Sequence, residues 1–450
     1  MPRVNQSTPV SVSPARRCLK EAKVPRRRPF VGAVSIVILC LAAAACSSST
    51  SSAGSTSSSS TAGGGSTGAV SSGTGSTAHG SAIEIGVVSA DTAVGVHSND
   101  VPTTVTLWQN WVNAHGGIGG HPVQVIEKDT QGSASTADSI VNQFAQDSNV
   151  IAIFDNDPTS DGTWAKTAAA AGLPVICMTA AQSNFTCQSQ PNFFPVGSSL
   201  TTVLWAQSYL AKLANVQKIS FFACAEAAQC ATAMTLQKGW ATKNGLDTVY
   251  TGLVAASQPS YAAPCLAAKS AGATGVVLEM SPTVAGKMAD DCAAQSYHPT
   301  YTITSPLITP QNLADPNLNG TVSDFTTWPW ILTDTPAQKE FARVMGSRWP
   351  SMSSFDTEAY PPIVWAALQL FAAAGAHLPA SPTRQDVFNG IYSLGPNYTD
   401  GGLIPPQTIV KGKPTVNSCF FAAKLEDGKL AASFGTQSFC APAYAANIGA

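Results

Sequence analysis

From residue 83 onward, short runs of aliphatic and β-branched residues alternate with longer stretches in which apolar residues recur every three or four positions. IEIGVVS at 83–89 predicts a strand. The stretch 101–115 predicts a helix, because Val101, Val105 and Trp108 share one face and Gly116 ends it. The same alternation predicts strands at 122–129, 149–154 and 173–177 and helices at 133–147 and 160–171. This order is typical of a parallel sheet with helices on both faces.

A second series has the same form. Its predicted strands are 218–223, 247–255, 275–280 and 300–304, and its predicted helices are 199–214, 228–244, 260–271 and 284–296. The expected fold class is therefore α/β, with two doubly wound parallel-sheet lobes.

Beyond residue 320 the order changes to helices at 335–348, 356–374 and 383–394 and a β pair around 418–434. Because the first lobe has fewer helices than the second, we expect the chain to cross back and make both lobes discontinuous. The expected first lobe is 83–197 plus 306–328. The expected second lobe is 198–305 plus 329–440 with the returning segments.

The front of the chain has a different pattern. Three arginines, Arg26 to Arg28, precede an apolar run at 30–45, and small residues lead into Cys46. This arrangement predicts an export signal over 1–46 and resembles a bacterial lipoprotein signal with Cys46 as the lipidated residue. Plain cleavage, an uncleaved anchor and twin-arginine export are the alternatives. The Ser, Thr, Gly and Ala-rich stretch 47–82 predicts a flexible tether.

Composition excludes two classes of partner or location. The 450 residues carry 24 basic and 26 acidic side chains, and only 11% are charged, so nothing indicates nucleic-acid binding. The 44% hydrophobic share is spread over many short segments, which excludes a polytopic membrane protein.

Eleven cysteines are present, and Cys18, Cys40 and Cys46 belong to the front segment. An even number remains in the exported body, which indicates disulfides. Closeness along the chain predicts the pairs Cys177 with Cys187, Cys224 with Cys230, Cys265 with Cys292, and Cys419 with Cys440. No cysteine or histidine spacing is typical of a zinc site, and we expect neither a metal nor a cofactor.

Several segments resemble one family. NAHGGIGGHPV (113–123), PVICMTAAQSNFT (174–186), GKMADDCAAQSY (286–297) and EAYPPIVWAALQLF (358–371) are similar to segments of type I periplasmic binding proteins of the leucine/isoleucine/valine-binding kind. The resemblance covers roughly 83–440. It implies two lobes joined by three crossovers, near 195–200, 304–310 and 326–334. It also implies a small-molecule ligand caught between the lobes and presented to an ABC-type permease.

In the first lobe the resemblance implies ligand contacts from Thr159 and Ser160, where the family holds a ligand carboxylate. Capping of the following helix is the alternative for both, and the nearby aspartates disfavour an anion. The family's Ala-Thr pair falls on Ala180 and Ala181, so Gln182 is the candidate to replace the missing hydroxyl.

In the second lobe Tyr261 matches a position that packs over the ligand, with plain interface packing as the alternative. The family's ammonium-binding acid falls on Val284, so Glu279, at the end of a predicted strand, is the candidate substitute. Asp91, which follows the first strand, is a further candidate. For both acids the alternative is a solvated loop carboxylate.

Together these features predict an exported, lipid-anchored and monomeric binding protein for a small polar ligand, such as an amino acid, amide, urea or organic acid. A sensing or scaffold module that signals to a separate membrane protein is the alternative. We do not expect an enzyme, because no G-x-S-x-G elbow is present and no histidine has a partnering motif.

Overall fold

The computed structural model describes residues 78–446, apart from 94–99, 182, 184–185, 227, 353–354 and 357–358. The predicted signal over 1–46, Cys46, most of the 47–82 tether and Gln182 lie outside the described residues. They therefore stay predictions.

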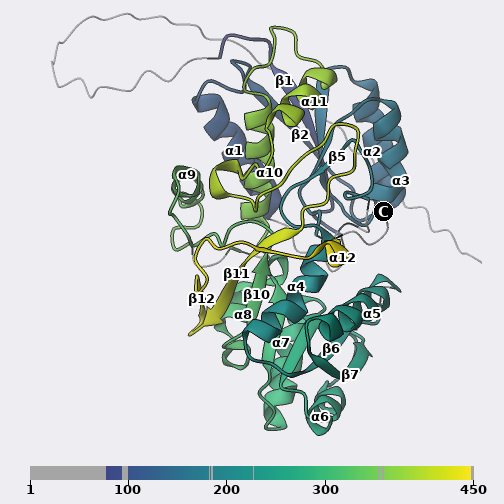
Figure 1. Ribbon diagram of the computed structural model, residues 1–450. Coiled ribbons are helices and arrows are strands. Elements are labelled where there is room, and N and C mark those ends of the chain that lie inside the picture. Colours follow the sequence, from purple (N-terminus) through teal and green to yellow (C-terminus); the bar gives the residue numbers. More distant parts are fainter. Residues whose placement is uncertain are drawn as a thin grey trace, which may run out of the picture. The chain divides into compact units, whose positions relative to one another are not determined.

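The first lobe is built on a five-stranded sheet of order β2-β1-β3-β4-β5, in which all neighbours are parallel (Figure 1). The strands are β1 (Ile83–Ser89), β2 (Val123–Asp129), β3 (Val150–Asn156), β4 (Val175–Cys177) and β5 (Phe193–Pro195). Helices α1 (Asp100–Ala114), α2 (Ala134–Gln146) and α3 (Asp161–Ala170) connect them. Separate apolar clusters pack around this sheet, one including α1 and the other α2 and α3.

Three helices from late in the chain complete this lobe: α9 (Pro336–Met345), α10 (Pro361–Ala374) and α11 (Arg384–Ser393). Helix α10 is apolar almost throughout and packs between α1 and α11, and its Phe371 ring lies 5.5 Å from that of Phe154 in β3. None of the helices in the described part of the chain is long and apolar enough to cross a membrane.

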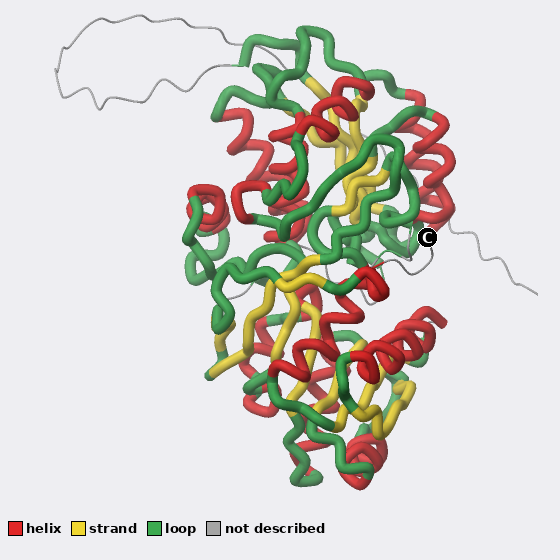
Figure 2. Tube along the Cα trace, viewed as in Figure 1, coloured by secondary structure: helices red, strands yellow, loops and turns green. Residues whose placement is uncertain are grey.

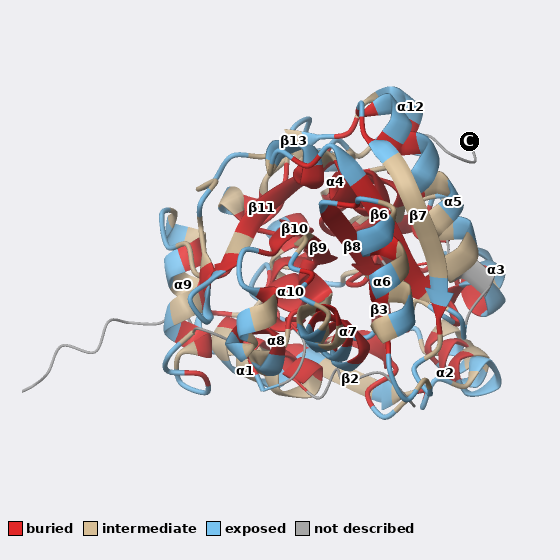
Figure 3. Cartoon of the chain, turned by 90° about the horizontal axis from the view of Figure 1, so that it is seen from below, coloured by how far each residue is buried: buried red, intermediate tan, exposed pale blue. Residues whose placement is uncertain are grey.

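The second lobe contains a mixed sheet of order β12-β11-β10-β9-β8-β6-β7, with β13 paired to β11. Its strands are β6 (Lys218–Cys224), β7 (Asp247–Val254), β8 (Gly275–Glu279), β9 (Thr300–Thr304), β10 (Val322–Phe325), β11 (Cys419–Glu426), β12 (Lys429–Ala431) and β13 (Phe439–Cys440). Its helices are α4 (Leu200–Leu213), α5 (Ala228–Lys243), α6 (Ala262–Ser270), α7 (Pro282–Ala294), α8 (Pro310–Ala314) and α12 (Ala443–Ala446). Figure 2 shows helices surrounding the strands in both lobes, and Figure 3 shows that most of the central strands and much of α4 and α10 are buried.

The structure assigns two segments differently from the sequence-based expectation. The segment 306–328 was expected in the first lobe, but β10 lies in the second sheet, parallel to β9 and antiparallel to β11. Most of 329–440 was expected in the second lobe, but α9, α10 and α11 pack on the first. The expected crossover at 304–310 is therefore wrong. The chain crosses between the lobes at 196–199, 326–335 and 403–418.

The crossovers are hydrogen-bonded to one another. The Ser198 amide donates to the Thr326 carbonyl at 3.1 Å, and the Ser199 amide donates to the Asn417 carbonyl at 3.0 Å. Gly197 has φ 74°, and a Cβ there would lie 2.4 Å from the Thr326 oxygen. The close approach of two crossovers therefore requires glycine at this position.

Four disulfides join the eight cysteines of the body in the pairs that are close in sequence. Cys177 is joined to Cys187, Cys224 to Cys230, Cys265 to Cys292, and Cys419 to Cys440. Three of these bridges lie within the second lobe, where they link β6 to α5, α6 to α7, and β11 to β13.

Candidate ligand-binding cleft

A cavity of about 550 Å³ is lined by residues of both lobes. Much of its wall follows the carboxyl ends of strands. Thr159 follows β3, Glu226 follows β6, Glu279 ends β8 and Met280 follows it. Ligands of open α/β sheets bind at this edge. The apolar part of the wall consists of Pro158, Ala181, Leu200, Val203, Leu204, Ala233, Val254, Ala256, Met280, Val284 and Leu307.

A larger hollow of about 830 Å³ lies along α7 and α8. Its wall is charged and polar and includes Lys287, Asp290, Asp315 and Asp356. Since helices and the loops beside them form this hollow, it does not have the position expected of a ligand site in an open α/β sheet. The 550 Å³ cavity is therefore the candidate ligand site.

Three of the predicted contacts line the cavity, namely Thr159, Ala181 and Glu279. Ser160 does not, because its side chain is turned inward and only 1% exposed. The Ser160 hydroxyl donates to Asp157 at 2.8 Å and accepts from the Trp164 indole at 3.3 Å. It makes no capping hydrogen bond to α3. Ser160 therefore neither lines the cavity nor caps α3, and its hydroxyl instead binds the Asp157 carboxylate.

Three other candidates lie away from the cavity wall. Ala180 is buried in the first-lobe core. Asp91 is buried at the end of β1, where it accepts a 2.6 Å hydrogen bond from the Ser89 hydroxyl. Tyr261 is fully buried in the second-lobe core, and its hydroxyl donates to the Ala255 carbonyl at 2.9 Å. Tyr261 is therefore a packing residue, which was the alternative to ligand contact for this position.

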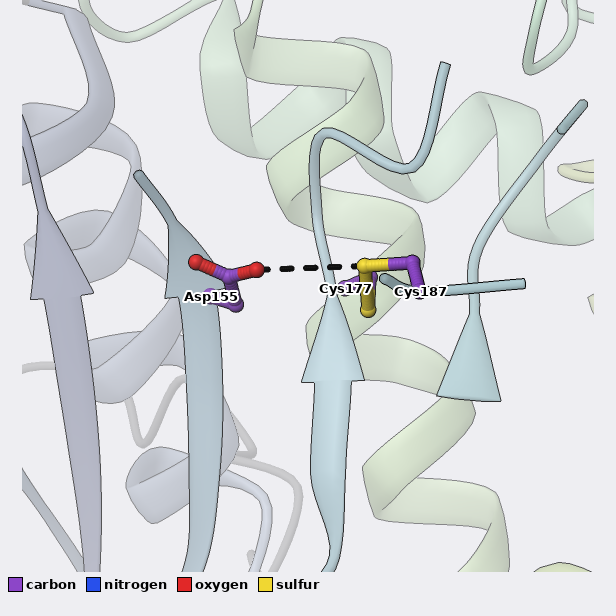
Figure 4. Close-up of side chains that lie close together, drawn as sticks. All are labelled: Asp155, Cys177 and Cys187. Carbon is purple, nitrogen blue, oxygen red and sulfur yellow. Dashed lines mark hydrogen bonds between the residues drawn. A yellow bond between two sulfur atoms is a disulfide. The ribbon is translucent and has the colours of Figure 1, made fainter. Parts of the chain in front are cut away.

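An acidic cluster lies behind the first-lobe wall. Asp155 lies against the disulfide between Cys177 and Cys187, with the Cys187 sulfur 3.8 Å from its carboxylate (Figure 4). Burial and the neighbouring Asp161 raise the pKa of Asp155 well above its usual range. Burial also raises the pKa of Asp161 to about 6, although the Ser183 hydroxyl donates to it. Because both sulfurs are in a disulfide, they have no thiolate charge with which to bind a cation.

A second acidic network begins in the cavity wall. Glu279 accepts a 2.8 Å hydrogen bond from the Gln237 amide of α5, and burial raises the pKa of Glu279 to about 7. Behind it, Asp324 of β10 accepts hydrogen bonds from Gln207 and from Thr304, the latter at 3.2 Å. Burial and the charge of Glu279 raise the pKa of Asp324 well above its usual range. The second lobe thus places carboxyl groups both at the wall and beneath it.

Glu226 is a cavity residue that the sequence reasoning missed. It lies in the short loop closed by the disulfide between Cys224 and Cys230, and both cysteines line the cavity. Its carboxylate accepts a 2.6 Å hydrogen bond from the Ala256 amide, which lowers the pKa of Glu226. The available signal was an acid between two close cysteines, directly after a predicted strand.

Charge in the cavity is of one sign. Glu226 and Glu279 are its acidic residues, and none of the described residues that line it is basic. The rest of the wall is apolar or neutral, so the site combines an apolar surface with two carboxyl groups.

The sequence profile of the periplasmic binding protein family matches residues 82–429. The chain belongs to the periplasmic binding protein family. This is a family of binding proteins and not of enzymes. A search of the curated proteins finds no match.

Solved structures of several binding proteins are similar to this periplasmic binding protein. A fatty acid ABC transporter substrate-binding protein from Thermomonospora curvata is 16% identical, with 83% of this chain and 97% of the other covered and a TM-score of 0.66. LivJ from Streptococcus pneumoniae, in complex with isoleucine, is 14% identical, with 80% and 99% covered and a TM-score of 0.63. An ABC transporter solute-binding protein from R. palustris, in complex with benzoate, is 16% identical, with 78% and 94% covered and a TM-score of 0.61. At these identities the likeness shows the fold, and it confirms the expected two parallel-sheet lobes.

Proposed function

We propose that this periplasmic binding protein captures one small molecule between its lobes and delivers it to an ABC-type permease. The observation that carries the proposal is the 550 Å³ cavity, whose wall comes from both lobes and from the carboxyl ends of parallel strands. Its size suits a small molecule and not a folded protein partner. The similar proteins from Thermomonospora curvata and R. palustris are binding proteins of ABC transporters, which supports the same role.

The protein is proposed to act as a lipoprotein on the outer face of the cytoplasmic membrane. The basic and apolar front segment followed by Cys46 supports this anchor, and the 47–82 stretch supplies the tether. A Ser and Gly-rich tether of this length spans on the order of 30 Å, enough for the body to reach a neighbouring permease.

The ligand is proposed to combine an apolar body with a polar end. The sequence-based candidates were amino acids, amides, ureas and organic acids, all of them polar. The leucine, valine and methionine side chains of the wall add an apolar requirement. Three similar binding proteins, one named for fatty acids and two in complex with isoleucine and benzoate, also have ligands with apolar bodies.

Closure is proposed to follow ligand binding. The three crossovers are the covalent links between the lobes in the described chain, and a ligand that contacts both walls favours the conformation in which the lobes are closest. Delivery to a permease then depends on recognition of this closed conformation.

A thermal-shift screen of the exported chain against a broad small-molecule library tests the proposal. A ligand that binds the native state raises the melting temperature by mass action, and small-angle X-ray scattering with that ligand should show a smaller radius of gyration. Failure of every small molecule to raise the melting temperature would contradict solute capture and favour the sensing or scaffold alternative.

A further inference from the structure

We infer that the cavity takes a cationic ligand: an amine with an aliphatic or aromatic body and no carboxylate, its positive end placed against Glu279 and Glu226. This inference rests on the proposed function and specifies its substrate class. Four features of the cavity and one of the first lobe support it.

The walls select an apolar body. Val203 and Leu204 of α4, together with Met280 and Val284 beside β8, line the cavity and are largely shielded from solvent. Each ligand methylene buried against such a surface strengthens binding about fourfold. A small hydrophilic molecule such as urea would leave this surface unused.

The two carboxyl groups come from neighbouring strands. Strand β8 pairs with β6 so that Glu279 lies opposite Ala223, and Glu226 follows three residues later. Both line the same cavity. The cavity thus offers the positive end of a ligand two carboxyl groups, one at the end of β8 and one in the loop after the adjacent strand β6.

Among the described residues of the cavity wall, no basic side chain neutralises this pair. Lys287 is the lysine of the nearby helix α7, but its ammonium donates to the Gln258 carbonyl at 3.1 Å and lies 5.5 Å above the Tyr261 ring. It belongs to the wall of the other hollow. A ligand carboxylate in the cavity would therefore meet like charge without a counter-ion.

The first lobe supplies its own carboxylates at the place where the family resemblance predicted a ligand carboxylate. The hydroxyls of Thr159 and Ser160 both donate to Asp157 at 2.8 Å. Asp161 occupies the first turn of α3 and accepts from Ser183. The hydroxyls and the positive end of the α3 dipole are already matched by internal acids, so an added anion would be repelled.

Glu279 is prepared for an ammonium partner. One of its oxygens accepts from Gln237, and burial without a cation raises its pKa to about 7. A bound ammonium would favour the ionised carboxylate and form a charge-assisted hydrogen bond with it.

Isothermal titration calorimetry of the exported chain with matched probes tests the inference. The aliphatic set is 3-methylbutylamine, 4-methylpentanoate, 4-methylpentanamide and leucine; the aromatic set is 2-phenylethylamine, 3-phenylpropanoate, 3-phenylpropanamide and phenylalanine. At least one amine should bind about tenfold or more tightly than the acid and the amino acid with the same body.

Variants locate the charge. Glu279→Gln should weaken amine binding by about tenfold or more while leaving binding of the neutral amide unchanged. Glu226→Gln should weaken amine binding less, because Glu226 is exposed. Glu426→Gln is the matched control, since Glu426 is an exposed residue of β11 and does not line the cavity.

Three results would overturn the inference: no amine binds, the acid or amino acid binds as tightly as its amine, or the amine binds both correctly folded glutamine variants with wild-type affinity. In each case a ligand of another class found in the broad thermal-shift screen would leave the proposed solute capture standing. The absence of any ligand in that screen would remove both.

Discussion

Replacing Arg384 by alanine removes the hydrogen-bonded contact of the returning helix α11 with the first lobe, while the packing of Phe388 and Tyr392 on Phe194 of β5 remains. Arg384 is the first residue of α11, and its guanidinium is half-buried beneath the ends of α2 and α3. It donates to the carbonyl oxygens of Phe144, Ala145, Asp147, Val150 and Ala171, at distances of 2.7 to 3.2 Å. Several of these carbonyls end a helix and have no partner within it.

The magnitude follows from what each substitution leaves unpaired. A hydrogen bond from a charged donor contributes about 1.5–3 kcal/mol, but the six that share this one side chain do not add, and water can reach part of this half-buried site. We expect Arg384→Ala to lower the free energy of unfolding by about 3–4 kcal/mol. Arg384→Lys should cost about 2 kcal/mol, because an ammonium has three donors in place of a planar five-donor fork.

Urea unfolding followed by circular dichroism measures these differences. Arg343→Ala is the matched control, because Arg343 is exposed and pairs with Glu340 one turn earlier on α9, so its loss should cost under about 1 kcal/mol. If Arg384→Ala cost no more than Arg343→Ala, guanidinium capping would not be what holds α11 on the first lobe.

Three other perturbations test the crossovers, the buried acid and the disulfides. Gly197→Ala forces a Cβ to 2.4 Å from a backbone oxygen of the second crossover and should lower the free energy of unfolding by about 2–4 kcal/mol. The control Gly245→Ala is also at positive φ but in open space, and it should lower the free energy of unfolding by about 1 kcal/mol. Equal urea midpoints for the two variants would contradict the clash between the crossovers. Burial raises the pKa of Glu279 from 4.5 to about 7, so between these pH values the native state retains a proton that the unfolded state loses. The free energy of unfolding of the ligand-free protein should therefore fall from about pH 4.5 to 7. Glu279→Gln should remove up to about 3 kcal/mol of that fall, and an unchanged pH profile would refute the assignment. Peptide mapping without reductant should show four linked pairs and no free thiol among the eight cysteines, and crossed pairs would contradict the fold of the second lobe. Replacing Cys224 and Cys230 together by alanine should lower the free energy of unfolding by only about 2 kcal/mol, because the loop that their disulfide closes is short.

The strands and helices of both sheets were largely predictable because each segment has a clear local period. The strands that escaped prediction are β5, β10 and β13, with three, four and two residues, which are too short to show any period. Lobe assignment failed for a different reason. Helix α10 is apolar almost all round, so its sequence does not indicate which sheet it covers, and only contacts with α1 and α11 decide the matter.

The site residues, too, were predictable only where their position depends on local sequence. Thr159 and Glu279 could be placed at the cavity wall because they lie at strand ends, and strand ends can be located from the sequence. Ser160 and Tyr261 were misplaced because side-chain direction depends on partners such as Asp157 and the Ala255 carbonyl, which no motif specifies. Glu226 was missed because its place in the wall depends on how its disulfide loop folds.

The uneven division of the wall suggests an order of binding. The first lobe contributes Pro158, Thr159 and Ala181, which are small and neutral, whereas both carboxyl groups and most apolar side chains come from the second lobe. A ligand that meets the second lobe alone therefore already finds most of its charge and apolar contacts. The first lobe adds mainly the exclusion of water, which strengthens the electrostatic contact by lowering the local dielectric constant. We therefore expect the second lobe to determine which ligand binds, and closure of the first lobe to determine how long it stays.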